Sequence, residues 1–269
     1  MIGPGRTPRI VALGGGGFGA GGRDHALDAY VAALAGPQNP RICLLPTASG
    51  DPHEQIARFN ATFRHLGCQT SHLSLFRLGE QPVAVRQHLL AQDAIYVGGG
   101  SMLNLIAIWR AHRLDRILEE AWRGGILLCG VSAGSMCWFE AGITRSHGKP
   151  RPSPGLGFLP GSNCVHYDAD PLRRPSYHEH VARRRVPAGY GVDDGAALVF
   201  DGTELAEVVS GRPTAGACRV ELVNREIVET PLEVRRLEHV EVQRRGGDPA
   251  LGELQSLRAE SRPRLGLRR

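Results

Sequence analysis

Short apolar segments alternate with amphipathic segments through the first half of the chain, and this alternation limits the fold more than any other feature. Arg9–Leu13, Arg41–Pro46 and Ala94–Val97 are mostly apolar, and each is followed by residues whose apolar positions recur at helical spacing. Parallel strands need crossover connections of this kind, and helices on both faces bury the strands between them. Ile126–Gly130 is wholly apolar, which is typical of the centre of such a sheet. The sequence therefore predicts an α/β fold, a three-layer sandwich with a mostly parallel central sheet.

The second half of the chain has a different pattern. Pro150–Gly161 is rich in proline and glycine, which predicts a surface loop, and Pro171–Arg185 has the pattern of a helix. We expect the β segments after Gly195 to add antiparallel strands to the edge of the main sheet. The strands expected in this half are Asn163–Tyr167, Ala197–Phe200, Leu205–Val209 and Cys218–Val223. We expect one α/β domain over residues 1–243 and a basic, disordered tail over residues 244–269.

The composition argues against several classes of protein. No apolar run approaches the ~20 residues that span a bilayer, and no apolar segment of a secretory signal follows the N-terminus, so we expect a cytoplasmic protein without a membrane partner. The six cysteines form no CxxC pair, and we expect neither a metal nor a cofactor. The net charge is +5, but Lys149 is the only lysine and no nucleic-acid-binding motif is present, so we expect no specific nucleic-acid partner.

A serine stands at the turn between the apolar strand and the segment after it. Gly130-Val131-Ser132-Ala133-Gly134 follows that strand and precedes an expected helix, Ser135–Glu140. This is the context of a nucleophile elbow, in which small neighbours permit a sharp, strained turn that projects the serine hydroxyl beyond the sheet. The free N–H groups of the helix N-terminus would then face developing negative charge. A serine that only caps a helix would give the same short pattern.

A second glycine-rich turn, Gly98-Gly99-Gly100-Ser101, follows another predicted parallel strand. Active sites of α/β proteins form where such strands end, so this turn is expected beside Ser132. A backbone N–H of Gly99 or Gly100, together with that of Ala133, would form an oxyanion hole. A plain tight turn is the alternative.

A nucleophilic serine needs a base, and His166 is the first candidate among the histidines. It ends the short apolar segment beginning at Asn163 and precedes a polar turn, which places it at the mouth of the sheet. His178 and His180 are alternatives, but they lie in a predicted helix among charged residues. The serine and the histidine together suggest acyl transfer through a covalent intermediate.

The carboxylate that would orient the imidazole is open between several residues. Glu140 follows the nucleophile segment and is our first choice. Asp193 and Asp194 precede a predicted strand and are alternatives, whereas Asp168 is too close in sequence to His166.

The first glycine run, Gly14–Gly19, contains the spacing GxGxxG after a strand and supports a rival hypothesis. In that hypothesis the chain is a non-catalytic nucleotide-binding protein. The second strand, however, ends in Leu45–Ser49 without the acidic residue that would bind a ribose. We therefore interpret the run as a tight turn that borders the active-site crevice.

Three segments together resemble the peptidase E family of aspartyl dipeptidases, which is related to cyanophycinase. They are Tyr96–Ser101, Gly130–Ser135 and Val165–Asp168, and the order and spacing match from the first strand to Val209. The resemblance implies a class I glutamine-amidotransferase-like (flavodoxin-like) fold in which serine replaces cysteine as the nucleophile. Two features depart from the family pattern: Ser101 stands where many members carry asparagine, and the C-terminal strands extend beyond the peptidase core.

The resemblance also implies roles for particular residues. By position, Ser132 is the nucleophile, His166 the general base, and Glu140 the first choice for the acid. It implies a metal-independent exopeptidase that acts on small peptides with an N-terminal aspartate. Arg173 and Arg174 are our candidates for binding the substrate carboxylate, since guanidinium groups bind carboxylates bidentately. A cyanophycinase-like activity on β-linked Asp-Arg would use the same residues, and a homodimer is left open.

Overall fold

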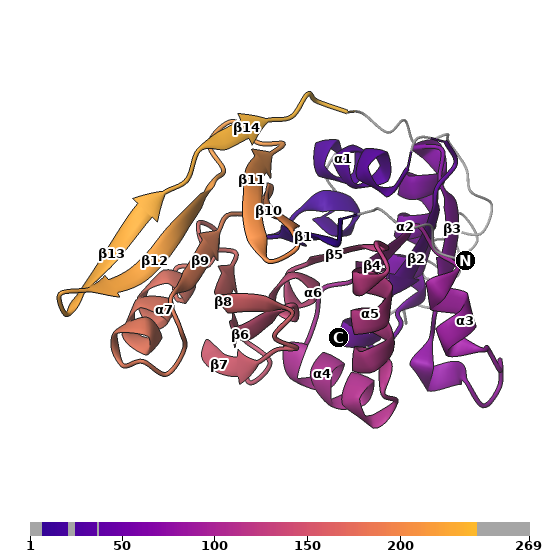
Figure 1. The fold of residues 1–269 in the computed structure, drawn as a ribbon, viewed down its shortest axis with the longest axis horizontal. Helices are drawn as coiled ribbons and strands as arrows, with labels where there is room; N and C mark the ends of the chain where they lie inside the picture. Colours follow the sequence, from indigo (N-terminus) through magenta and orange to yellow (C-terminus); the bar gives the residue numbers. More distant parts are fainter. Residues whose placement is uncertain (1–6, 21–24, 37, 241–269) are drawn as a thin grey trace, which may run out of the picture.

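Two β-sheets with helices packed around them form the described part of the chain, residues 7–20, 25–36 and 38–240 of a computed structural model (Figure 1). The larger sheet has eight strands in the order β14-β11-β10-β1-β5-β4-β2-β3. In chain order these are β1 (Arg9–Leu13), β2 (Arg41–Leu45), β3 (Gln69–His72), β4 (Ala94–Val97), β5 (Leu127–Val131), β10 (Ala196–Asp201), β11 (Glu204–Ser210) and β14 (Val234–Arg236).

The strands β1, β5, β4, β2 and β3 run parallel to one another. The apolar residues buried on the two faces of the larger sheet belong to two separate clusters, with α1 and α2 over one face and α3, α4 and α5 over the other (Figure 1). The helices are α1 (Ala26–Ala35), α2 (His53–His65), α3 (Val85–Leu90), α4 (Met102–Ala111) and α5 (Leu114–Arg123), with 3-10 turns η1 (Gly17–Ala20), η2 (Thr47–Ser49) and η3 (Leu75–Arg77). The predicted three-layer α/β fold is thereby confirmed.

Large side chains fill both spaces between the sheet and its helices. Phe18, Phe59 and Phe63 pack on Tyr96 on one side, with ring centroids 5.2–6.2 Å apart in the edge-on contacts that involve Phe18. Trp109 is completely buried on the other side. Burial of this apolar surface is the main source of the stability of the fold.

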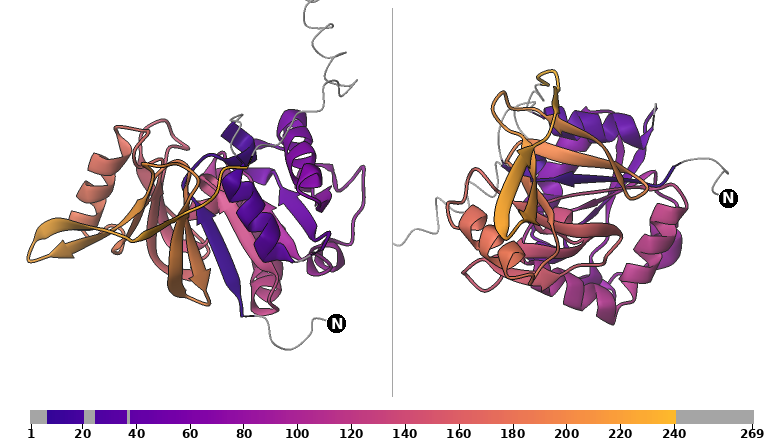
Figure 2. Two further views of the ribbon diagram at one scale, coloured as in Figure 1. Left: turned by 90° about the horizontal axis from the view of Figure 1, so that it is seen from above. Right: turned by 60° about the vertical axis from the view of Figure 1, so that its left-hand side comes forward.

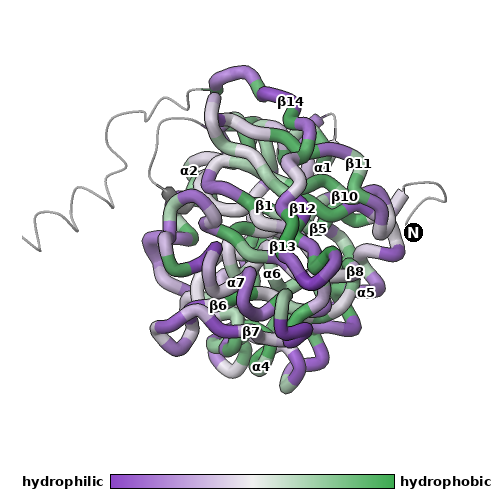
Figure 3. Tube along the Cα trace, turned by 90° about the vertical axis from the view of Figure 1, so that its left-hand side faces the viewer, coloured by the Kyte–Doolittle hydropathy of each residue, from purple (hydrophilic) through white to green (hydrophobic). Residues whose placement is uncertain are grey.

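A second, six-stranded sheet stands beside the larger one and has the order β13-β12-β9-β8-β6-β7 (Figures 1 and 2). Its strands are β6 (Phe139–Thr144), β7 (Arg151–Pro154), β8 (Leu159–Val165), β9 (Gly189–Val192), β12 (Ala217–Val223) and β13 (Glu226–Pro231). Helix α7 (Arg173–Ala182) packs on one face through Tyr177 and Val181. Phe139 and Tyr190 contact Phe200 of the larger sheet, so apolar packing joins the two sheets. Seen from the side of the smaller sheet, hydrophilic residues gather on the outer loops (Figure 3).

Three expectations for the second half of the chain need correction. The Cys218–Val223 segment pairs with β9 and β13 in the second sheet and does not extend the main sheet. The expected Pro150–Gly161 loop contains β7 and the start of β8. The expected helix Ser135–Glu140 is a single turn, α6 (Ala133–Met136), after which β6 begins. Pairing between strands distant in sequence decides each case, and local patterns do not show it. The expected tail lies outside the described residues.

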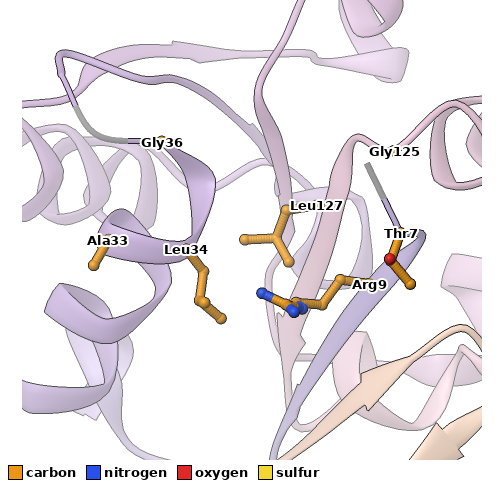
Figure 4. Close-up of a pocket in the computed structure, with 7 residues that line it drawn as sticks. All are labelled: Thr7, Arg9, Ala33, Leu34, Gly36, Gly125 and Leu127. Atoms are coloured by element: carbon orange, nitrogen blue, oxygen red, sulfur yellow. The ribbon is translucent and has the colours of Figure 1, made fainter. Parts of the chain in front are cut away.

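The two ends of the parallel strands differ in their surroundings. Ser132 follows the carboxyl end of β5, whereas a pocket at the amino ends of β1 and β5 is lined by Thr7, Arg9 and Leu127 (Figure 4). In that pocket Arg9 Nε donates to Asp201 at 2.6 Å. Within the described ranges, no helix has the length and apolar character needed to cross a bilayer.

Candidate active site

Ser132 occupies a strained turn between β5 and α6. Its φ of 57° and ψ of −112° lie in a region that residues with a side chain avoid, at a cost of about 1–3 kcal/mol. The Ser132 N–H donates to the Leu13 carbonyl at 3.2 Å, and its carbonyl accepts from the N–H groups of Ser135 and Met136, each at 3.0 Å. The surrounding hydrogen bonds therefore hold the strain and leave the side chain at the edge of the sheet.

Two glycines make this turn sterically possible. A Cβ on Gly130 would lie 2.3 Å from the Gly134 carbonyl oxygen, and a Cβ on Gly134 would lie 2.3 Å from the Val97 oxygen. Real Cβ atoms essentially never come so close, so both positions require glycine. The glycines of the motif Gly130–Gly134 are thus needed because the turn leaves no room for larger side chains at these two positions.

His166 reaches Ser132 from the second sheet. It directly follows β8 and has a positive φ of 54°. Its Nε2 lies 2.9 Å from Ser132 Oγ, within hydrogen-bonding distance. The structure therefore brings together the two residues that the sequence named first.

Asp194 lies on the other side of the imidazole. His166 Nδ1 is 2.5 Å from Asp194 Oδ1. Strands β8 and β9 run parallel with Val165 opposite Val192, so the residues that follow each strand meet at one edge. An ionised Asp194 can only accept, so it fixes the tautomer with Nδ1 as donor and leaves Nε2 free to accept from Ser132 Oγ.

The first choice for the acid, Glu140, is not in this arrangement. It lies on β6 and not on a helix, and its Oε2 accepts from the Gly161 N–H at 3.2 Å. Asp194, one of the two alternatives, takes the position beside His166. The difference arises because chain proximity to Ser132 suggested Glu140, whereas pairing of β8 with β9 determines which carboxylate approaches.

A family model describes the same stretch of chain. The model for Peptidase family S51 matches residues 10–208, which include the whole Ser132–His166–Asp194 arrangement. The chain belongs to peptidase family S51. This confirms the resemblance to peptidase E inferred from the motifs.

Similar proteins support the assignment to this family. The chain is 44% identical over 229 residues to the "Uncharacterized peptidase YgaJ" of Bacillus subtilis (strain 168), which covers 85% of this chain and 99% of the relative. It is 28% identical over 196 residues to "Peptidase E" of Streptomyces coelicolor, covering 68% of this chain and 76% of the relative.

Solved structures resemble this S51 peptidase in fold. A peptidase from an acI-B1 actinobacterium matches with a TM-score of 0.65 at 18% identity, covering 87% of this chain and 97% of that one. A putative peptidase E from Listeria monocytogenes EGD-e matches with a TM-score of 0.53 at 17% identity, covering 77% and 100%. At such identities the similarity concerns the fold alone.

The first glycine run of this S51 peptidase packs against the acid. A Cβ on Gly15 would lie 2.0 Å from Asp194 Oδ1 and 2.8 Å from His166 Nδ1. A Cβ on Gly14 would lie 2.2 Å from the Asp193 oxygen. The run therefore borders the active site, as expected, and its glycines serve a close approach within the protein itself.

The expected oxyanion donors lie near the nucleophile. The position of a Cβ on Gly99 is 3.3 Å from Ser132 Cβ and 3.9 Å from Ser132 Oγ. Gly100 instead packs on η2, where its Cβ would lie 2.3 Å from the Ala48 oxygen. Among the described residues, and apart from hydrogen bonds within helices and strands, the N–H groups of Gly99 and Ala133 donate to no backbone carbonyl. Gly99 is thus better placed than Gly100 to pair with Ala133.

The two arginines expected to bind substrate already have partners. Arg173 is buried, and its guanidinium donates to the Ile143 carbonyl and to Asp170. The Arg174 guanidinium pairs with both carboxylate oxygens of Glu229. Both residues therefore have partners in or beside the second sheet and α7, and their expected role in binding a substrate carboxylate stays a prediction.

The carboxylates around His166 have distinct environments. Burial raises the pKa of Asp193, and the hydrogen bond from the Gly216 N–H at 2.9 Å partly opposes this. Asp168 Oδ1 accepts from the Asp194 N–H at 2.8 Å. In the described ranges, no group of three or more His, Cys, Asp or Glu side chains is arranged to hold a metal ion.

Sequence reasoning missed how Asp194, Asp168 and Gly15 contribute to the site. A usable signal was present for Asp194, because Asp193 and Asp194 follow the end of one short strand just as His166 follows the end of another. Carboxyl ends of neighbouring parallel strands meet at one edge, so polar residues at two such ends are candidates for contact. No local pattern shows which strands are neighbours.

Proposed function

We propose that this S51 peptidase is a serine-type enzyme that hydrolyses short peptides through an acyl-enzyme on Ser132. The observation that carries the proposal is the continuous line of contacts from Ser132 Oγ through His166 to Asp194, at 2.9 and 2.5 Å. A serine activated by an imidazole, which a carboxylate orients in turn, is a recurring arrangement for acyl transfer.

The residues suggest the following sequence of bonds made and broken. Ser132 Oγ attacks the scissile carbonyl carbon while His166 Nε2 takes the hydroxyl proton. The oxyanion accepts from the N–H groups of Ala133 and Gly99. The C–N bond then breaks, and the His166 proton passes to the leaving amine. Water repeats the attack on the ester, and its proton returns through His166 to Ser132 as the acid product leaves.

The decisive experiment compares Ser132→Ala with the wild type on a dipeptide library. We expect hydrolysis to fall by at least about 10³-fold, because the nucleophile is lost while binding remains. Ser176→Ala is a matched control, since the Ser176 hydroxyl donates a hydrogen bond to the Pro150 carbonyl, outside the set of proposed catalytic residues. A fluorophosphonate probe should add one adduct that mass spectrometry places on Ser132. Undiminished hydrolysis by Ser132→Ala, or an adduct elsewhere, would refute the proposal.

For the substrate, we propose dipeptides with N-terminal aspartate. The support is the relative named Peptidase E and the shared motifs. A substrate carboxylate that bound to Arg174 would have to displace the Glu229 carboxylate from its guanidinium. Assays of Asp-X, β-linked Asp-Arg and Ala-X dipeptides separate this proposal from a cyanophycinase-like activity. A higher kcat/KM for Ala-X than for Asp-X would contradict it.

We also propose that the enzyme works in the cytoplasm. The cysteines Cys43, Cys68, Cys129, Cys137, Cys164 and Cys218 are all free thiols. Reducing compartments keep thiols in this state. Fractionation of cells that express the chain tests the location.

A further inference from the structure

The backbone of Asp194 is held on both sides by one pair of charged side chains. Its N–H donates to Asp168 Oδ1 at 2.8 Å, and its carbonyl accepts from Arg212 Nη1 at 2.8 Å. The same Nη1 lies 3.4 Å from Asp168 Oδ2. Asp168 follows His166 by two residues, so this pair links the strand end that carries the base to the residue that carries the acid.

Arg212 is itself fixed in place by the C-terminal part of the chain. Its N–H donates to Ser210 Oγ at 3.1 Å, and its carbonyl accepts from Arg236 Nη1 at 2.8 Å. Its aliphatic stem lies against Gly195, where a Cβ would come within 2.5 Å of Arg212 Cδ. Gly195 has a φ of +86°, so the residue next to Asp194 has both a conformation and a contact that favour glycine.

The charges around Asp194 also depend on Arg212. The Asp193 carboxyl lies close enough to Asp168 and Asp194 for the charges to interact, and Arg212 contacts the Asp168 carboxylate and the backbone carbonyl of Asp194. Besides burial, the charges of Asp168 and Asp194 raise the pKa of the Asp193 carboxyl, and the charge of Arg212 lowers it. Without the guanidinium, mutual repulsion would favour movement of the Asp194 loop away from Asp168.

We propose that Arg212 and Asp168 are positioning residues that hold Asp194 where its carboxylate can orient His166. This inference rests on the proposed function. Arg212 lies beyond residue 208, where the match to the S51 family model ends, and between β11 and β12. The C-terminal strands, which extend past the peptidase core, therefore support the acid through one guanidinium.

The test compares Arg212→Ala and Arg212→Lys with Arg235→Ala as the matched control. Arg235 lies nearby in the chain's C-terminal part, on β14, but it pairs with Glu207. We expect Arg212→Ala to lower kcat about 10- to 100-fold, since a small displacement of a catalytic group has effects of this size. KM should change less than about twofold, because substrate binding is not touched. Lysine should restore part of kcat, and Arg235→Ala should match the wild type.

A second readout does not depend on activity. A proton in the short His166–Asp194 hydrogen bond should give a ¹H NMR signal far downfield of the amide region. We expect the signal to broaden or vanish in Arg212→Ala and to persist in Arg235→Ala. If Ser132→Ala kept full activity, the proposed function would fail. The NMR signal would still test whether Arg212 and Asp168 hold Asp194 beside His166. Wild-type kcat together with an unchanged signal in Arg212→Ala would overturn the inference.

Asp168→Asn provides the complementary variant if Arg212→Ala does not fold. The asparagine oxygen can still accept from the Asp194 N–H, but the charge that pairs with Arg212 is lost. We expect a smaller loss of kcat than in Arg212→Ala, and a loss in the double variant below the product of the single losses. If the loss of kcat in the double variant equalled the product of the two single losses, the residues would act separately. That result would contradict the proposal that Arg212 and Asp168 hold Asp194 together.

Discussion

The nucleophile and its two partners come from regions that are built in different ways. Ser132 lies in the parallel sheet, on a turn whose geometry depends on glycines within a few residues and on neighbouring strand ends. His166 and Asp194 follow β8 and β9 of the second sheet, 28 residues apart in the chain. The first region is specified mostly by local sequence, and the second by pairing between distant strands.

This difference has consequences for how each region fails. Backbone hydrogen bonds to the turn and to β1 hold the strain at Ser132, and Gly130 and Gly134 have no room for a Cβ, so changes to these glycines should disturb the fold of the sheet itself. The base and acid are held by a few long-range contacts to Gly15, Asp168 and Arg212. Changes there should disturb the chemistry while the fold persists.

Removing the charge of the acid should give the largest effect in the second region. Asp194→Asn keeps the shape of the side chain, but its amide can stabilise the wrong tautomer of His166, so we expect kcat to fall about 10³- to 10⁴-fold. Glu140→Gln is the control, since Glu140 contacts the Gly161 N–H. Steady-state kinetics on the preferred dipeptide measures both. A larger loss in Glu140→Gln than in Asp194→Asn would return the acid to the residue first chosen from sequence.

The sequence predicts the first region well and the second poorly, for a physical reason. Short apolar segments identified β1, β2, β4 and β5, and the turn pattern identified Ser132. The second sheet was not predicted, because short strands of similar composition carry no local record of their neighbours. That omission explains the choice of Glu140 over Asp194.

Adding one methyl group at Gly15 should show that the chemistry of the second region can be disturbed while the fold persists. Gly15→Ala would place its Cβ 2.0 Å from Asp194 Oδ1, so the carboxylate must move away from His166. We expect kcat/KM to fall about 100-fold. The control is Gly79→Ala, because a Cβ on Gly79 would meet no atom within 4 Å. Circular dichroism melts should show that both variants fold, and activity of Gly15→Ala equal to that of Gly79→Ala would show that the acid tolerates displacement.

The smallest effect is expected from the native thiols. Burial raises the pKa of Cys218 and of Cys68 to about 11, and it raises that of Cys129, beside the nucleophile turn, well above its ordinary value. A thiol with a pKa of about 11 is about 0.1% thiolate at pH 8, and only the thiolate reacts readily. Iodoacetamide should therefore leave the peptidase activity unchanged.

The variant Ser132→Cys gives the matching positive result. A thiol at this turn would lie beside His166, which lowers the pKa of a paired cysteine in other proteins and makes it reactive. We expect rapid alkylation of residue 132 in this variant, read by mass spectrometry of its peptides, while the six native cysteines stay unmodified until the protein is unfolded. Equal labelling of a native cysteine and of residue 132 would mean that the site does not activate its nucleophile. In that case the second region would supply a structural contact to the turn and no base.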